Sequence, residues 1–145
     1  PYLEDETDRQ AGAFDIQITA ALATAAMRDA GLSPHRLSRS SYRHAYWTVA
    51  QLLAHHTVNG CNLSSGDLLG TGTLSGPTLD QAGALIELTA GGRNPLTLPD
   101  GETRTFLEDG DTLILSAWCE KPGAARIGFG DARATVLPAR TTLSV

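Results

Sequence analysis

One glutamate within an apolar run is the residue of this sequence best suited to acid–base chemistry. Glu87 lies in Ala-Leu-Ile-Glu-Leu-Thr at residues 84–89, a run that predicts a strand with apolar neighbours on both sides of the glutamate. Burying a carboxylate there is costly unless it is ion-paired, hydrogen-bonded or protonated. Such a group can hold a histidine general base in one tautomer and stabilise its protonated form. A solvent-facing glutamate on a half-buried strand fits the sequence equally well.

A glycine-rich segment is the second candidate. Residues 66–76 read Gly-Asp-Leu-Leu-Gly-Thr-Gly-Thr-Leu-Ser-Gly, without the lysine and following hydroxyl that a phosphate-binding loop needs. Three glycines on and after a strand favour close approach of a ligand or a neighbouring chain to the backbone. Thr73 would then donate its hydroxyl to a carboxylate. A simple bend in the strand explains the same glycines.

The histidines and turn aspartates give no metal-binding pattern. His55 and His56 are adjacent on a predicted helix, where neighbouring side chains diverge by about 100°, so they do not form a chelating pair. Asp67, Asp109 and Asp111 each adjoin a glycine, which is typical of turns. We therefore predict no metal ligand in this chain, and the residues alone show no complete catalytic set.

The elements that position these residues form a mainly β pattern with one main helix. Apolar positions at helical spacing predict that helix over about residues 43–58, capped by Ser40 or Ser41 and ended by Asn59-Gly60. Alternation over residues 14–18 predicts a strand, with residues 35–41 as the returning arm of a hairpin. Residues 20–30 are ambiguous between helix and strand, and residues 1–12 read as a solvated connector. Further strands are predicted at residues 67–73, 84–89, 96–98, 112–120 and 126–137.

Composition narrows the class of protein. The chain has 145 residues, a formal net charge of −5 and a single lysine, which argues against nucleic acid as a partner. Its longest apolar run is far shorter than the ~20 residues of a membrane helix, so we expect no membrane association. Two cysteines are too few for a disulfide framework, which predicts a reduced, cytoplasmic setting. The length fits one domain.

Several motifs resemble one enzyme family. The run His-His-Thr-Val-Asn-Gly-Cys-Asn-Leu at residues 55–63 continues into the glycine-rich segment, and both are similar to the C-terminal part of the fumarylacetoacetase family. The likeness continues through residues 83–88, 104–111, 126–130 and 136–139, and upstream through residues 1–3, 14–16 and 46–48. It therefore covers essentially the whole chain.

The resemblance implies a fold, an activity and partners. The implied fold is α+β and mainly β, a mixed β-sandwich or roll of the family's C-terminal domain type. The implied enzyme is a cytoplasmic homodimer that hydrolyses a carbon–carbon bond of 4-fumarylacetoacetate, giving fumarate and acetoacetate in the last step of tyrosine and phenylalanine breakdown. Its small-molecule substrate is bound with a divalent ion, Ca²⁺ or Mg²⁺. Residue by residue, Glu87 matches the family's glutamate that partners the histidine base, and Thr73 matches a substrate-binding threonine.

The remaining catalytic groups of the family have no match in this sequence. The resemblance assigns the histidine base, the metal-binding carboxylates and the family's N-terminal barrel-like domain to segments upstream of residue 1. We therefore expect residues 1–145 to be part of the catalytic domain, to depend on that upstream segment, and to be inactive alone. The alternatives are another member of the superfamily, an acylpyruvase or isomerase, and a non-catalytic dimerisation scaffold.

Overall fold

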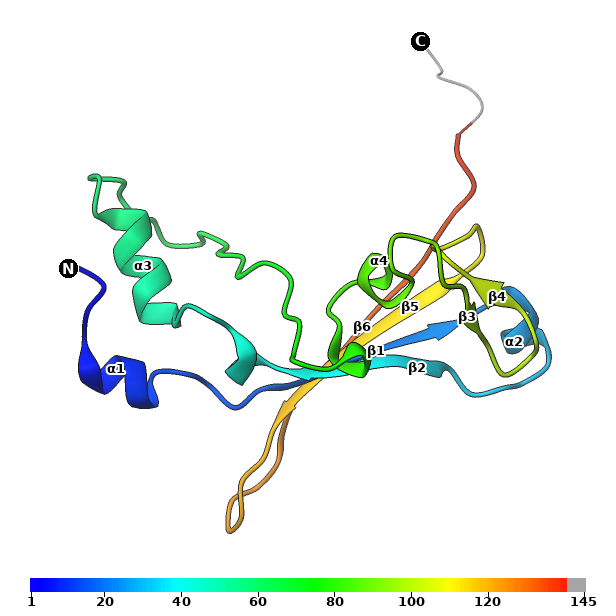
Figure 1. The fold of residues 1–145 in the computed structure, drawn as a ribbon, viewed down its shortest axis with the longest axis horizontal. Helices are drawn as coiled ribbons and strands as arrows, with labels where there is room; N and C mark the ends of the chain where they lie inside the picture. Colours follow the sequence, from blue (N-terminus) through cyan, green and yellow to red (C-terminus); the bar gives the residue numbers. More distant parts are fainter. Residues whose placement is uncertain (141–145) are drawn as a thin grey trace.

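A four-stranded antiparallel sheet forms the centre of the molecule. In the computed structural model, which describes residues 1–140, its strands are β1 (Gln17–Ala23), β2 (His35–Ser41), β5 (Thr112–Cys119) and β6 (Ile127–Thr135). They lie in the order β2-β1-β5-β6, and a second, two-stranded sheet pairs β3 (Leu96–Thr97) with β4 (Thr103–Arg104) (Figure 1). The prediction of a mainly β, α+β fold is confirmed.

The first hairpin follows the predicted pairing with a shifted start. The returning arm at residues 35–41 is confirmed, whereas β1 begins at Gln17 and leaves Phe14 outside the sheet, 57% exposed. The ambiguous residues 20–30 divide between the end of β1 and a short helix, α2 (Ala25–Asp29). Thr24 separates the two because its hydroxyl accepts a hydrogen bond from the Met27 amide and caps the helix.

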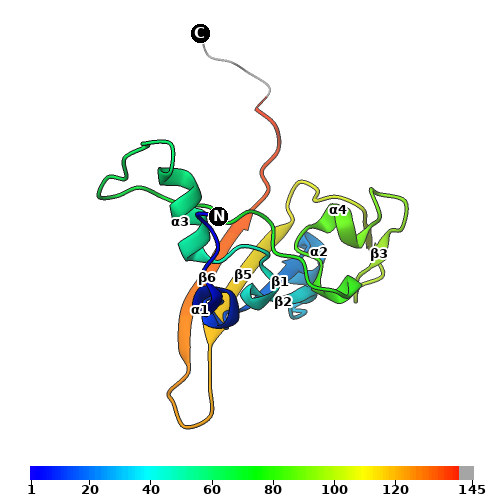
Figure 2. The ribbon, with the colours of Figure 1, turned by 60° about the vertical axis from the view of Figure 1, so that its left-hand side comes forward.

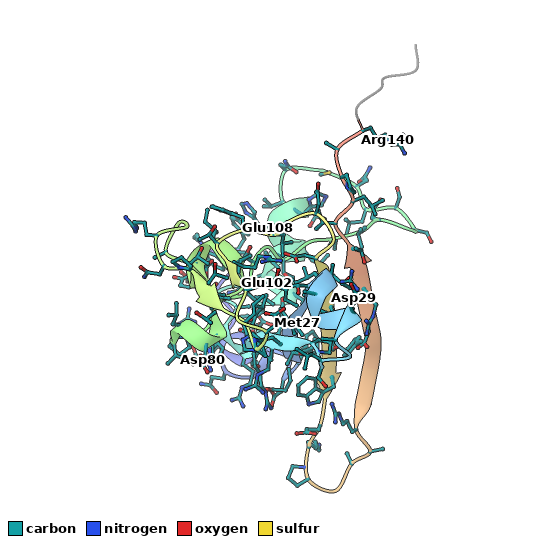
Figure 3. All side chains as sticks on the ribbon, turned by 90° about the vertical axis from the view of Figure 1, so that its right-hand side faces the viewer. Met27, Asp29, Asp80, Glu102, Glu108 and Arg140 are labelled. Carbon is teal, nitrogen blue, oxygen red and sulfur yellow. The ribbon has the colours of Figure 1, made fainter. Side chains whose placement is uncertain are left out.

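The apolar core is small and lies at one end of the sheet. It consists of Leu22 from β1, Met27 from α2 and Leu98 beside β3, with Leu37 of β2 packed against them. Met27 is labelled in Figure 3, beneath the segment that carries β3 and β4. This packing joins the two sheets, because each contributes a side chain to it.

The main helix is shorter than predicted and begins at a different cap. It is α3 (Val49–Thr57), and Thr48 caps it in a reciprocal arrangement with Gln51. Ser40 and Ser41, the predicted caps, belong to β2; Ser41 instead caps the short 3₁₀ helix η1 (Tyr42–His44). No residue of α3 is buried, so its apolar positions do not form a core face. In Figure 1 the helix stands away from the sheet, and in both views it lies near the N-terminus (Figures 1 and 2).

Three further predictions are corrected by the structure. Residues 1–12 contain a helix, α1 (Glu6–Ala11), because Asp5 caps it through the Asp8 amide. Residues 67–73 form no regular element. Residues 84–89 form no strand but a one-turn helix, α4 (Leu85–Leu88), which follows the 3₁₀ helix η2 (Leu79–Gln81).

Local hydrogen bonding explains why the apolar run folds as a helical turn. The amides of Glu87 and Leu88 both donate to the Ala84 carbonyl, and the Thr89 hydroxyl donates to the Leu85 carbonyl. Ala90 then adopts a left-handed φ of 49°, followed by Gly91 and Gly92, also left-handed, which ends the turn. In this turn the side chains of Leu88 and Thr89 are buried, and that of Glu87 is exposed.

Candidate functional site

Glu87 lies on α4 with its side chain exposed, so the solvent-facing alternative is the one observed, and the predicted strand is wrong. Its carboxylate is nevertheless held by a specific partner. The Ser75 hydroxyl donates to the Glu87 Oε2 over 2.6 Å, and the Ser75 Oγ accepts from the Gly83 amide over 3.1 Å. The glutamate is thereby joined to the glycine-rich segment that contains Thr73.

The two loops that meet here are in close contact. A methyl group at Gly83 would lie 2.6 Å from the Thr73 Cγ2 and 2.7 Å from the Leu74 carbonyl oxygen, so only glycine fits without displacement. The Gly76 amide also donates to the Gln81 carbonyl over 2.9 Å. The close approach predicted for the glycine-rich segment thus occurs at Gly76, where the neighbour is Gln81 of the same chain. At Gly70 and Gly72 an added methyl group would have no neighbour within 4 Å.

A cavity of about 300 Å³ opens beside this junction. Thr73 and Ser75 contribute to its wall, as does an aromatic pair, Tyr46 and Trp47, whose rings pack edge to face with centroids 4.8 Å apart. The remaining wall is formed by His44, Ala45, Leu52, Thr71 and Leu74. Tyr46 and Trp47 are 86% and 44% exposed, so both rings lie at the surface of the described part of the chain.

The arrangement can bind and orient, but residues 1–140 do not complete an acid–base set at the cavity. Glu87 offers a carboxylate fixed through one oxygen, and Thr73 offers a hydroxyl on the cavity wall. His44 is the one histidine in that wall, on the side of the aromatic pair. No hydrogen bond between His44 and Glu87 occurs in the part of the chain that the structure describes, so the predicted imidazole partner of Glu87 is not supplied by residues 1–140.

The adjacent histidines have separate partners, as expected for non-chelating side chains. His55 Nδ1 lies 2.9 Å from the Tyr2 hydroxyl and its ring stacks on the tyrosine. His56 Nε2 lies 3.4 Å from the Cys61 Sγ. Both contacts lie in the last turn of α3, where they anchor the N-terminal residues and the loop that follows the helix.

The turn aspartates have structural partners. Asp67 accepts from the Ser64 amide, which is the predicted turn role. Within residues 1–140 no group of three or more histidine, cysteine, aspartate or glutamate side chains is placed to hold a metal ion. The donor set of this chain therefore does not fit a divalent ion by itself.

Asp111 has a role that sequence reasoning missed. It is fully buried and accepts from the Arg104 Nε and Nη2 over 2.9 and 3.1 Å, and from the Glu108 amide. Hydrogen bonding to Asp111 raises the pKa of the Arg104 guanidinium. Glu102 and Glu108, both labelled in Figure 3, complete the ion pairs of Arg104. The seven-residue spacing from an arginine to an Asp-Gly-Asp turn is the only sequence signal for this pair.

Sequence reasoning also passed over Ser75. Its signal is modest, a hydroxyl two residues after Thr73 and directly before Gly76-Pro77. Gly76, the residue after Ser75, and Gly83 together mark two backbone segments that approach closely.

An antiparallel sheet whose connecting loops hold a carboxylate beside a small cavity is the class that residues 1–140 define. The family model described as "Fumarylacetoacetate (FAA) hydrolase C-terminal" matches residues 9–137, so the chain belongs to the fumarylacetoacetate hydrolase family. Curated relatives carry the name fumarylacetoacetase. Those of Dictyostelium discoideum and Arabidopsis thaliana are each 44% identical, over 140 and 138 residues, covering 95% of this chain and 31% of theirs.

The human fumarylacetoacetase is also 44% identical, over 126 residues, covering 87% of this chain and 29% of the human protein. The chain thus spans about a third of the length of the curated relatives it matches. None of the helices in the described part of the chain is long and apolar enough to cross a membrane.

Proposed function

We propose that this chain is the C-terminal part of a fumarylacetoacetase. The activity is hydrolysis of the carbon–carbon bond of 4-fumarylacetoacetate to fumarate and acetoacetate, the last step of tyrosine and phenylalanine breakdown. The carrying observation is the match to the family over residues 9–137, together with relatives of that name at 44% identity. The junction of Glu87, Ser75 and Thr73 beside one cavity supports a site at this position.

Glu87 is the proposed catalytic partner of a histidine base contributed by the rest of the enzyme. Its carboxylate accepts the imidazole N–H and stabilises the imidazolium that forms when the base takes a proton from water. The water oxygen bonds to the carbonyl carbon next to the double bond, and the carbon–carbon bond to the adjacent methylene breaks. That methylene takes a proton and becomes the methyl group of acetoacetate, which balances the reaction.

Thr73 is the proposed substrate-binding residue. It lies on the cavity wall with its side chain exposed, where its hydroxyl can donate to a carboxylate of the dianionic substrate. The phenol and indole groups of Tyr46 and Trp47 line the same cavity, which suits the flat, unsaturated part of such a substrate.

The divalent ion, the oligomeric state and the location belong to the same proposal. A Ca²⁺ or Mg²⁺ ion would polarise substrate oxygens, with ligands outside residues 1–145, since the described residues offer no such cluster. The complete enzyme is proposed to be a cytoplasmic homodimer, in which the upstream segment packs on this part of the chain.

A comparison of two substrates tests this assignment. The complete polypeptide that carries these residues is incubated with 4-fumarylacetoacetate and, separately, with a short acylpyruvate, and kcat/KM is measured for each. A kcat/KM at least tenfold higher for 4-fumarylacetoacetate supports the proposal. A higher kcat/KM for the acylpyruvate identifies another superfamily activity. If neither compound is hydrolysed, with or without added Mg²⁺ or Ca²⁺, the protein is a non-catalytic scaffold.

A further inference from the structure

Ser75 makes the one side-chain contact to the Glu87 carboxylate among the described residues. Its hydroxyl proton is directed at Oε2 over 2.6 Å, a short hydrogen bond of the charge-assisted kind. The Ser75 Oγ also accepts a hydrogen bond from the Gly83 amide over 3.1 Å, so the hydroxyl is held both as donor and as acceptor. The Ser75 rotor therefore has one favourable orientation, with its proton on the glutamate.

The backbone around Ser75 is held from two sides. Gly83 packs against Thr73 and Leu74 at distances that exclude any side chain, and Gly76 is bonded to Gln81 just beyond. The serine is thus part of a tightly joined loop pair, whereas Glu87 extends from a one-turn helix with an exposed side chain. The exposed Glu87 carboxylate is therefore oriented by a serine whose own backbone is held on two sides.

The contact uses one carboxylate oxygen and leaves the other free. With Oε2 bound to Ser75, Oε1 is available to accept an N–H from an imidazole. Fixing the carboxylate before that contact forms spares the cost of ordering a long side chain during the reaction.

We propose that Ser75 is a positioning residue for Glu87, holding the carboxylate in the orientation that receives the base. This inference rests on the proposed function and extends it to a residue that touches neither the reacting atoms nor the base. The net contribution of one hydrogen bond to a charged group corresponds to about a tenfold change in rate, and we expect an effect of that size.

The test measures kcat and KM of the complete enzyme with Ser75→Ala, Ser75→Thr and Ser75→Cys. We expect kcat about tenfold lower in Ser75→Ala with KM within twofold, near-normal kcat in Ser75→Thr, and an intermediate value in Ser75→Cys, whose thiol is a weak donor. Thr78→Ala is the matched control, because the Thr78 hydroxyl is exposed and makes no capping hydrogen bond.

A double-mutant cycle with Glu87→Gln separates positioning from other roles. If Ser75 acts through the glutamate, Ser75→Ala adds less than twofold in the Glu87→Gln background. A full additional tenfold loss there, a raised KM with unchanged kcat, or kcat within twofold of normal in Ser75→Ala would each overturn the proposal. If Ser75→Ala does not fold, Ser75→Cys decides by the same criteria.

Failure of the proposed function would show differently. In that case the unaltered enzyme does not hydrolyse 4-fumarylacetoacetate, whereas failure of the positioning role leaves the unaltered enzyme active and changes only the variants.

Discussion

At the residue scale, two acidic side chains show the opposite of the burial that their sequence surroundings suggest. Glu87 sits in an apolar run and is exposed, and Asp111 sits in a polar turn and is fully buried. The difference follows from their partners. Glu87 has one serine hydroxyl, whereas Asp111 has a guanidinium bound through two nitrogens and a backbone amide. The first arrangement leaves a carboxylate oxygen free for chemistry, and the second leaves none.

Removing the charge of Glu87 should affect turnover far more than folding. Because its side chain is exposed, Glu87→Gln costs little stability, but the amide cannot stabilise an imidazolium. We expect kcat of the complete enzyme to fall by roughly 10²–10⁴-fold, with the melting temperature and metal content nearly unchanged. Glu120→Gln, an exposed position in the β5–β6 connection, is the control. A loss of less than about threefold would remove Glu87 from the mechanism.

Removing the charge of Asp111 should have the opposite profile. Asp111→Asn leaves the buried Arg104 guanidinium with only the more exposed Glu102 and Glu108 as counter-ions, and breaking a buried ion pair costs about 3–5 kcal/mol. Asp109→Asn in the same turn changes an exposed carboxylate and should stay within about 0.5 kcal/mol of the unaltered protein. Denaturant unfolding of the three proteins measures both values. Equal stabilities would show that the pair is not a structural anchor.

At the element scale, short helices and caps fix the loops around the sheet. Thr48 both caps α3 and donates its hydroxyl to Asp8 of α1, so it connects the two helices that stand away from the sheet. Thr24 has the same double function at α2, where its hydroxyl also donates to Asp100. Each of these threonine caps thus links its helix to a second segment through the same hydroxyl.

The cap of α3 is open to a direct test. Thr48→Ala removes the acceptor for the Gln51 amide and should destabilise the helix by about 1 kcal/mol. Amide hydrogen exchange of residues 50–57 measures that loss as faster exchange in α3, with the rates of β1 and β5 unchanged. Thr78→Ala is again the control, since Thr78 caps η2 without a side-chain hydrogen bond. Uniform acceleration over the whole chain would contradict a local role.

The Thr24–Asp100 contact predicts a pH dependence. Desolvation raises the pKa of Asp100, but hydrogen bonds from the Glu102 amide and the Thr24 hydroxyl outweigh it and lower the pKa below 3.8. A carboxyl with a lowered folded-state pKa stabilises the fold above its unfolded-state pKa, and that stability is lost as pH falls through the folded-state value. Unfolding measured between pH 5 and about pH 2 should therefore lose less stability in Asp100→Asn than in the unaltered protein. Asp29→Asn, exposed on α2, should follow the unaltered protein.

The sequence predicted most strands of the two hairpins of the main sheet and missed the helical turns that local hydrogen bonds close. Residues 35–41, 112–120 and 126–137 were expected as strands, and β2, β5 and β6 lie there. The apolar run around Glu87 satisfies a strand pattern equally well, but the Thr89 hydroxyl and the glycines after Ala90 close it into a turn. The sequence indicates Thr73 and Glu87 as candidate site residues, whereas Ser75, which connects Glu87 to the same loop, carries no periodic signal.

At the scale of the whole molecule, much apolar surface faces outward. Tyr46 and Leu68 are 86% and 97% exposed, every residue of β6 is exposed, and no residue of α3 is buried. Exposed apolar area of this extent marks interaction surfaces. The two sheets and the small core between them form a framework, and the outer strand β6 leaves Ile127 and Phe129 exposed, at 63% and 62% (Figure 2).

The central claim is that this chain contributes one carboxylate and one hydroxyl to an active site that the rest of the enzyme completes. The most direct measurement compares the complete polypeptide with residues 1–145 alone, both supplied with Mg²⁺ or Ca²⁺, by quantifying fumarate and acetoacetate formed from 4-fumarylacetoacetate. We predict equimolar products from the complete polypeptide and none above background from residues 1–145. Equal turnover by residues 1–145, or no turnover by the folded complete polypeptide, would contradict the claim.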